Sequence, residues 1–338
     1  MIRKSAASTT PLSGVDVLLC DLDGVIYQGP SAIPYAVDSL VHAPARLAYL
    51  TNNASRTPAQ VAGQLAGFGL PAEASDVVTS PQAAVKLLRT LIPAGSLVLV
   101  VGGEGLTSEL ELAGFQVTRK ADDRPRAVVQ GFAPSVGWEQ LAEASFAIQR
   151  DDSVVWLATN TDWTIPVAGG IAPGNGALVS AVHLAVGKLA TFAGKPETPM
   201  FEVAKERFGA NLRYLMIGDR LDTDIMGANR AGIPSALVLT GIDRAKQVLA
   251  ADEVSRPTYI LEDLRQLHEP YPEIERATEG DVQVVRVGKA VVKRKGHVVR
   301  VAKNGRPIDT LRAGAAAIYD SGLKIFGLDV DPALYSTL

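Results

Sequence analysis

The stretch Cys20-Asp21-Leu22-Asp23-Gly24-Val25 follows a short and mostly apolar run at residues 15–20. An apolar run of this length that stops at turn residues predicts a buried strand of a parallel sheet. The carboxylates of Asp21 and Asp23 would then lie at the carboxyl end of the strand, which is where open α/β sheets bind ligands. In an extended chain both carboxylates point the same way, and Gly24 lets the chain turn away directly after them.

Two neighbouring carboxylates repel each other, so we expect a bound group that offsets their charge. A hard divalent cation with oxygen ligands would do so, and Mg2+ is the usual choice beside phosphate. One carboxylate could then attack phosphorus while the other carries a proton. The alternatives are a polar strand end and a fragment of a calcium-binding loop, although Gly24 comes too early for an EF-hand.

The composition bounds the number of domains and the class of protein. The chain has 338 residues, of which 47% are hydrophobic and 20% charged, so about two or three domains with a sizeable core are expected. The formal net charge of −3 gives no bulk attraction to nucleic acid or to an anionic membrane, and we expect neither partner. The single cysteine, Cys20, excludes an internal disulfide and fits a reducing compartment. Because no stretch has the length of a signal peptide core or a membrane span, we expect a cytoplasmic protein.

Strand and helix patterns alternate along most of the chain and indicate an α/β fold. We expect strands at residues 15–20, 46–50, 97–101, 127–130, 154–158, 214–217, 234–239 and 258–260. We expect helices at residues 34–42, 58–68, 81–91, 105–113 and 138–149, one ending at Phe208 and one starting at Glu262, and a long loop at 159–176. The pattern predicts a Rossmann-like parallel sheet core at residues 1–93 and 190–270, with a second α/β domain inserted at 94–189.

Polar residues recur where these strands end and helices begin. Thr51-Asn52-Asn53 follows the strand at 46–50, Lys195 precedes a helix, and Asp219 and Asp224 follow the strand at 214–217. Hydroxyl and amide groups at a strand-to-helix turn can bind an anion together with the free N–H groups of the helix. An ordinary helix cap would favour the same residue types.

The four segments together, in this order, resemble the four motifs of the haloacid dehalogenase superfamily of phosphotransferases. The domain inserted between the second and third motifs resembles the type-II cap of that superfamily. The class includes phosphatases of nucleotides, pyridoxal phosphate, phosphoglycolate and glycerol 3-phosphate. The resemblance covers roughly residues 14–268.

The resemblance gives the acidic residues catalytic and metal-binding roles. Asp21 would be the nucleophile that forms an aspartyl phosphate, and Asp23 the general acid and then the base for water. Asp21, the backbone carbonyl of Asp23, and Asp219 would bind Mg2+, with Asp224 supporting the metal shell. Because the dehalogenase members lack the second acid, Asp23 favours a phosphatase or mutase, and a mutase would usually have a smaller cap of another type.

The resemblance also implies which residues hold the phosphoryl group. Thr51, Asn52 and Asn53 would donate to its oxygens through the hydroxyl and backbone N–H groups. Lys195 would neutralise the charge of the phosphate and of Asp21. Phosphoryl transfer depends mainly on positioning and charge stabilisation, which such residues supply.

The loop at 159–176 resembles the substrate-facing loops of the class, and Asn160, Asp162 and Ile165 are its candidate substrate contacts. Ile165 stands where pyridoxal phosphate phosphatases of the class carry His and phosphoglycolate phosphatases an apolar residue. An apolar side chain there favours a small phosphorylated metabolite, and the resemblance of the C-terminal extension, described next, makes glycerol 3-phosphate the first choice. Phosphoglycolate, nucleotides and sugar phosphates are the alternative substrates, and packing against the core is the alternative role of Ile165.

Residues 274–338 have a different pattern from the rest of the chain. Alternating strands at 282–287, 290–295 and 298–302 predict an antiparallel meander, followed by a helix at 310–319 and a strand at 324–328. This α+β extension resembles the part-acetyltransferase extension of actinobacterial glycerol 3-phosphate phosphatases, but it lacks an Arg/Gln-x-x-Gly-x-Gly/Ala loop. We therefore expect it to be non-catalytic, with a binding or regulatory role. Because a unit of this size seldom forms a stable core alone, we expect it to pack on the rest of the chain or on a second subunit of a homo-oligomer.

Overall fold

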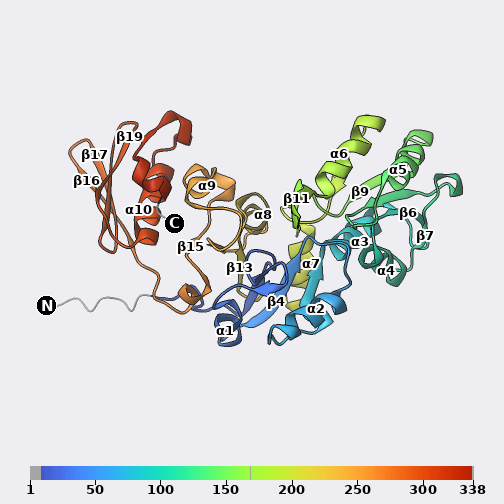
Figure 1. The fold of residues 1–338 in the computed structure, drawn as a ribbon, viewed down its shortest axis with the longest axis horizontal. Helices are drawn as coiled ribbons and strands as arrows, with labels where there is room; N and C mark the ends of the chain where they lie inside the picture. The colour runs from blue at the N-terminus through green and yellow to red at the C-terminus, as the bar shows by residue number, and fades with distance from the viewer. Residues whose placement is uncertain (1–8, 168, 337–338) are drawn as a thin grey trace. The chain divides into compact units, whose positions relative to one another are not determined.

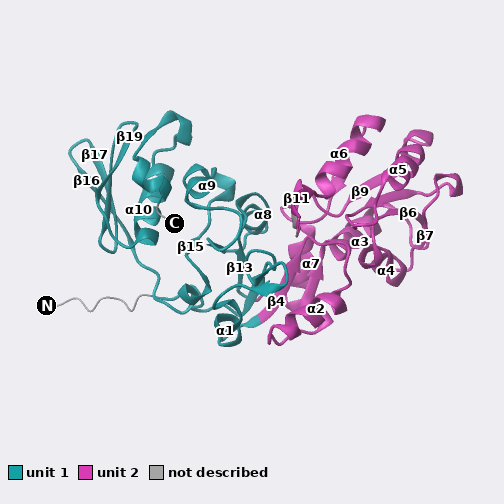
Figure 2. Cartoon of the chain, in the orientation of Figure 1, with its two compact units in different colours: residues 1–46, 213–338 teal, residues 47–212 magenta. Residues whose placement is uncertain are grey.

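The computed structural model describes residues 9–167 and 169–336, and its chain forms two compact units (Figures 1 and 2). Unit 1 comprises residues 1–46 and 213–338, and unit 2 comprises residues 47–212. Residues 1–8 lie outside the described residues. They belong to the N-terminal segment for which the sequence predicts no signal peptide. Among the described residues, every helix is too short or too polar to cross a membrane.

The parallel strands of unit 1 bring two acidic segments to one edge. In the order β15-β14-β13-β1 they are β15 (Tyr259–Leu261), β14 (Ser235–Val238), β13 (Tyr214–Gly218) and β1 (Val17–Cys20). All four residues of β1 are buried, as the apolar run predicts. Cys20 is in register with Ile217, and the N–H of Asp21 donates to the Ile217 carbonyl at 2.9 Å. The residues that follow β1 and β13 therefore leave the sheet side by side.

Short helices connect these strands. They are α1 (Ala36–Val41), α8 (Met226–Arg230) and α9 (Ala245–Ala250), and a two-stranded ribbon of β2 (Tyr27–Gln28) and β3 (Ser31–Ala32) precedes them. The helix that we expected to start at Glu262 is only a 3-10 turn, Leu264–Leu267. Asp263 caps this turn by accepting from the Arg265 N–H, and Pro270 soon follows, which disfavours a longer helix.

An antiparallel sheet fills the C-terminal part of unit 1. It contains β16 (Ile274–Glu279), β17 (Val282–Val287), β18 (Ala290–Lys295) and β19 (Val298–Lys303), with β20 (Asp329–Val330) parallel to β19. The meander that the sequence predicts is present. The prediction omits β16, an exposed edge strand without alternating apolar residues, and the strand expected at 324–328 is a 3-10 turn (Ile325–Gly327) before β20.

The C-terminal sheet packs on the parallel strands of its own unit through one helix. This helix, α10 (Pro307–Tyr319), lies between the sheet and α9 (Figure 1). One buried apolar cluster joins residues of β14 and α9, such as Leu237 and Val248, to α10 and to strand residues such as Val292. The extension therefore docks on the same chain, which is one of the two alternatives that the sequence leaves open.

Unit 2 carries two more parallel strands and the helices beside them. β4 (Arg46–Thr51) pairs with β5 (Val77–Thr79), and α2 (Pro58–Gly67), α3 (Ser80–Leu91) and α7 (Pro199–Phe208) accompany them. Thr57 and Gln60 form a capping box at the start of α2. The cap of this helix is thus Thr57, and the preceding Thr51-Asn52-Asn53 segment has another role.

A second parallel sheet occupies the middle of unit 2. In the order β12-β9-β8-β6-β7, its strands are β12 (Thr191–Phe192), β9 (Val155–Ala158), β8 (Ala127–Gln130), β6 (Leu97–Val101) and β7 (Gln116–Thr118). Its helices are α4 (Glu104–Leu112), α5 (Trp138–Arg150) and α6 (Asn175–Val186). A buried apolar cluster that includes Val128, Trp156 and Val179 joins α5 and α6 to the sheet.

The segment at 159–176 is more ordered than the loop that we expected. It forms an antiparallel hairpin of β10 (Thr164–Val167) and β11 (Gly170–Pro173), and α6 begins at Asn175. Its glycines are typical of a loop, but Gly170, which has a φ of 127°, is the first residue of β11 and pairs with Val167. Asn160, Asp162 and Ile165 are therefore held between strands and a helix.

Candidate active site

Three acidic side chains of unit 1 meet at the carboxyl edge of its parallel strands. One carboxylate oxygen each of Asp21, Asp219 and Asp224 lies within 4.8 Å of the others. Asp21 follows β1 and Asp219 follows β13, while Asp224 lies in the π-helical turn Leu221–Ile225. Asp219 and Asp224 are buried, so their charges cost free energy without a cation nearby. Carboxylate oxygens at this spacing suit Mg2+, which fits the metal predicted here.

The backbone around these acids fixes where their carboxylates point. The Ile242 N–H donates to Oδ2 of Asp219 at 2.7 Å, and the Arg220 N–H donates to Oδ2 of Asp224 at 3.2 Å. A Cβ atom added at Gly24 or at Gly241 would overlap the Asp219 carboxylate. The two glycines thus form a cradle that only residues without a side chain allow.

Asp23 lies just outside this cluster, with an exposed side chain. The chain turns immediately after it, because the Gly24 N–H donates to the Tyr27 carbonyl at 2.9 Å and Gly24 has a φ of 83°. The hydroxyl of Thr240 donates to the Gly24 carbonyl at 2.7 Å and fixes the turn. Asp23 is therefore accessible to solvent.

Cys20 precedes Asp21 and is fully buried. Burial raises the pKa of its thiol strongly, and the charge of Asp21 raises it further. A thiol in this state stays protonated, so Cys20 packs in the strand rather than reacting.

A second polar cluster, within unit 2, surrounds Lys195. The Lys195 side chain is 2% exposed and its Nζ donates to the Leu50 carbonyl at 3.3 Å. The Lys195 N–H donates to Oδ1 of Asn52 at 2.9 Å, and Nδ2 of Asn52 donates to the Lys195 carbonyl at 3.1 Å. The same Nδ2 donates to Oδ1 of Asp162 at 3.0 Å, and Nδ2 of Asn160 donates to the Asn52 carbonyl at 2.7 Å. The structure thus brings four of the predicted site residues into one network.

Thr51 and Asn53 form the turn between β4 and α2. The hydroxyl of Thr51 accepts from the Asn53 N–H at 3.1 Å, and Oδ1 of Asn53 accepts from the Ser55 N–H at 2.9 Å. Ile165, by contrast, is not in the network around Lys195. It is half-buried on β10, where it pairs with Ala172.

Residues 18–116 match the family model for haloacid dehalogenase-like hydrolases, and residues 192–267 match a HAD-hydrolase-like model. D-glycerol 3-phosphate phosphatase of Mycobacterium tuberculosis is 41% identical over 307 residues, which span 90% of this chain and 86% of the relative. The chain belongs to the haloacid dehalogenase-like hydrolases. The superfamily that the four motifs indicate is thereby confirmed.

A further relative and a solved structure are also similar to this hydrolase. Glycerol-3-phosphate phosphatase of Gallus gallus is 35% identical over 269 residues, which span 73% of this chain and 86% of the relative. The crystal structure of a glycerol phosphate phosphatase from Mycobacterium tuberculosis in complex with magnesium has a TM-score of 0.86 and 37% identity. That likeness covers 98% of this chain and 99% of the other. It confirms the predicted α/β fold.

Several residues that support the candidate site were not identified from the sequence. Gly241 and Ile242 support Asp219, Ser80 donates its hydroxyl to the Asn52 carbonyl at 2.7 Å, and Asn175 donates to the Asn160 carbonyl at 2.9 Å. Thr240-Gly241 directly follows the strand expected at 234–239, so the rule that polar and glycine residues after a strand mark the ligand edge could have identified it. The sequence offers no comparable signal for Ser80.

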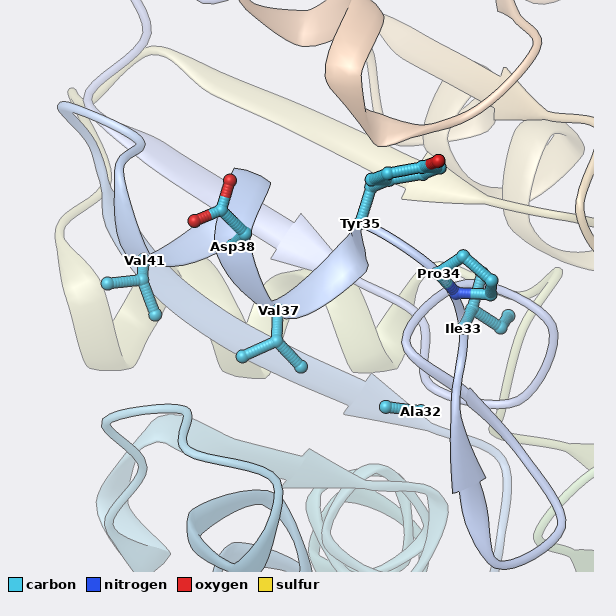
Figure 3. Close-up of a pocket in the computed structure, with 7 residues that line it drawn as sticks. All are labelled: Ala32, Ile33, Pro34, Tyr35, Val37, Asp38 and Val41. Carbon is cyan, nitrogen blue, oxygen red and sulfur yellow. The ribbon is translucent and has the colours of Figure 1, made fainter.

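A hollow of about 600 Å3 elsewhere on unit 1 is a separate feature of the hydrolase. It is lined by residues of the segment 32–41, which includes α1, and Tyr35 is one of them (Figure 3). The Cζ atom of the Arg265 guanidinium lies 3.8 Å from the centre of the Tyr35 ring. None of the three clustered acids lines this hollow. It is therefore not the candidate active site.

Proposed function

We propose that this hydrolase is a Mg2+-dependent phosphatase that cleaves a small phosphate monoester, with glycerol 3-phosphate as the first candidate. The cluster of Asp21, Asp219 and Asp224, with carboxylate oxygens within 4.8 Å at the carboxyl edge of the sheet, carries this proposal. The names of two relatives, D-glycerol 3-phosphate phosphatase and glycerol-3-phosphate phosphatase, support the substrate. The magnesium in a structural relative supports the metal.

The proposed reaction has two steps at phosphorus. A carboxylate oxygen of Asp21 attacks, the bond from phosphorus to the substrate alkoxide breaks, and Asp23 gives that oxygen its proton. Asp23, now ionised, takes a proton from water as the water attacks the aspartyl phosphate, which releases inorganic phosphate and restores both carboxyl groups. The exposure of Asp23 supports this exchange of protons, because the leaving alcohol and the water must both reach it.

The remaining site residues stabilise charge and position the phosphoryl group in this proposal. Asp21, Asp219 and the backbone carbonyl of Asp23 would hold Mg2+, with Asp224 in support. When bound, the ion offsets the charge of the carboxylates and of the phosphoryl oxygens. Thr51 and the backbone N–H groups of Asn52 and Asn53 would donate to those oxygens, and Lys195 would supply a further positive charge.

The substrate-facing residues favour a small leaving group. Asn160 and Asp162 would contact its polar atoms. Ile165 would present an apolar side chain at a position where binding of a ring would call for a polar one. Glycerol 3-phosphate and phosphoglycolate fit this description better than nucleotides or sugar phosphates. A panel of these four classes, assayed by phosphate release, ranks the candidates by kcat/KM.

The variant Asp21→Asn tests the proposal, because it removes the nucleophile and roughly keeps its shape. With Mg2+ present we expect its turnover to fall by a factor of at least about 1,000, which is a larger loss than a positioning residue usually causes. Asp16 provides a matched control, since it lies at the other end of β1 and pairs with Arg213 at 3.1 Å. Asp16→Asn should keep normal turnover. Near-normal turnover of Asp21→Asn would rule out the nucleophile and the proposed route with it.

A further inference from the structure

The side-chain amide of Asn52 binds both backbone polar groups of one residue, Lys195. Its Oδ1 accepts from the Lys195 N–H at 2.9 Å, and its Nδ2 donates to the Lys195 carbonyl at 3.1 Å. The second donor contact of Nδ2 reaches Oδ1 of Asp162 at 3.0 Å. A primary amide has two N–H donors and one carbonyl acceptor, so these three contacts use every polar group of the Asn52 side chain.

Asn52 is itself fixed from several sides. Its own carbonyl accepts from Oγ of Ser80 at 2.7 Å and from Nδ2 of Asn160 at 2.7 Å. Asn175, the first residue of α6, donates to the Asn160 carbonyl at 2.9 Å. The three asparagines are all at least nine-tenths buried, so water does not compete for these hydrogen bonds. A rigid frame thus holds the amide that binds Lys195.

Gly194, which directly precedes Lys195, shows how closely the backbone approaches the Asn52 side chain. A Cβ atom added at Gly194 would lie 2.7 Å from Oδ1 of Asn52 and would overlap the Thr159 carbonyl. Lys195 then extends its side chain to the Leu50 carbonyl. Because a lysine side chain has four rotatable bonds, the place of its ammonium group depends on a fixed backbone. Asn52 supplies that fixed point.

We propose that Asn52 is a positioning residue that holds Lys195 in the geometry needed for phosphoryl transfer. This inference rests on the proposed function, in which the Lys195 charge stabilises the phosphoryl group. Asn52 contributes its backbone N–H to the phosphate in that proposal, whereas its side chain acts through Lys195. Preorganised charges lose their effect when they shift, and a displacement of about 1 Å can cost on the order of 100-fold in rate.

The test compares the effect of removing the Asn52 amide in two backgrounds. In the wild-type background, Asn52→Ala should lower kcat by about 10- to 100-fold and change KM much less. In a Lys195→Ala background the same substitution should lower kcat by less than about threefold, because residues that act as a unit are not additive. Single-turnover assays at high enzyme concentration keep the slow variants measurable, and calorimetric titration with Mg2+ reports whether the acidic cluster is intact.

Asn229 provides the matched control for a purely structural amide. Its Nδ2 also donates to two backbone carbonyls, those of Val254 at 3.0 Å and Arg256 at 2.9 Å. Asn229→Ala should lower the melting temperature and leave kcat unchanged. If Asn52→Ala does not fold, Asn52→Asp serves in its place, because it keeps the volume and the Oδ1 acceptor and loses both donors.

The outcomes separate the inference from the proposed function. An equal loss of kcat in both backgrounds, or a loss of melting temperature alone, would overturn the positioning role of Asn52. Wild-type turnover of Lys195→Ala by itself would instead overturn the role of Lys195 in the proposed function. A large loss in the first background and a small one in the second, with Mg2+ binding unchanged, is the result we expect.

Discussion

Gly241 lies directly against Asp219, so a Cβ atom at position 241 would overlap the carboxylate of that residue. Gly241→Ala should therefore displace Asp219 from the acidic cluster although it adds only one methyl group. Changes to residues that orient a metal ligand typically cost about 10- to 100-fold in metal affinity or activity. We expect the dissociation constant for Mg2+, measured by calorimetry, to rise by a factor of this size and kcat to fall by a similar factor.

Gly327 gives the control for this substitution, because a Cβ atom there would meet no other atom within 4 Å. Gly327→Ala should bind Mg2+ and turn over like the wild type. If Gly241→Ala binds Mg2+ normally, Asp219 either tolerates the displacement or does not bind the metal.

Removal of the metal should stop turnover reversibly. The cluster offers carboxylate oxygens from Asp21, Asp219 and Asp224, and such oxygen donors suit both Mg2+ and Ca2+. Treatment with a chelator should abolish phosphate release, and added Mg2+ should restore it. Ca2+ should inhibit instead, because its larger and looser coordination sphere misplaces the attacking oxygen of Asp21. Full activity in the presence of excess chelator would contradict the metal-dependent route.

Ile165 allows a prediction about substrate choice. The wild type should prefer glycerol 3-phosphate or phosphoglycolate to pyridoxal phosphate in kcat/KM, and Ile165→His should shift the ratio toward pyridoxal phosphate by about tenfold. Ile171, on the neighbouring strand β11, is 70% exposed. Ile171→His should leave the ratio unchanged. A wild type that already prefers pyridoxal phosphate would show that Ile165 does not select the substrate.

The acids at the strand ends could be predicted from the sequence because local patterns determine them. Asp21 follows an apolar run that can only be a short buried strand, and Asp219 follows another. The contact between Asn52 and Lys195 joins residues 143 positions apart, and no local pattern encodes a pairing of a side-chain amide with a distant backbone. The positioning role that we propose for Asn52 could therefore be inferred only from the fold.

The missed elements of the fold have a similar explanation. β16 is an edge strand with almost all of its residues exposed, so it lacks the alternation that reveals a half-buried strand. The hairpin of β10 and β11 contains two prolines and two glycines within residues 164–173, a composition that is typical of a loop. Backbone pairing alone makes both segments into strands, and composition does not report such pairing.

Arg312 leads to the last prediction, which concerns stability rather than catalysis. Its guanidinium is 3% exposed on α10 and donates to the Ile260 carbonyl at 2.6 and 2.9 Å. It also donates to Oε1 of Gln266 at 2.8 Å and to Oδ1 of Asp309 at 3.0 Å. Arg312→Met would leave the buried Asp309 carboxylate unpaired, which should lower the free energy of unfolding by about 3–5 kcal/mol. The double variant with Asp309→Leu should lose less, because it removes both charges.

The measurement is a urea titration of the full chain, with phosphatase activity recorded for the folded variants. Arg300→Met is the matched control, since Arg300 pairs with Asp329 at 2.5 Å while both side chains remain about half exposed. An exposed pair of this kind contributes about 0–1 kcal/mol, so that variant should unfold almost like the wild type. Because α10 contributes no residue to the proposed chemistry, kcat should stay normal in all of these variants. Equal losses for Arg312→Met and Arg300→Met would mean that the buried network does not hold the C-terminal extension to the parallel strands.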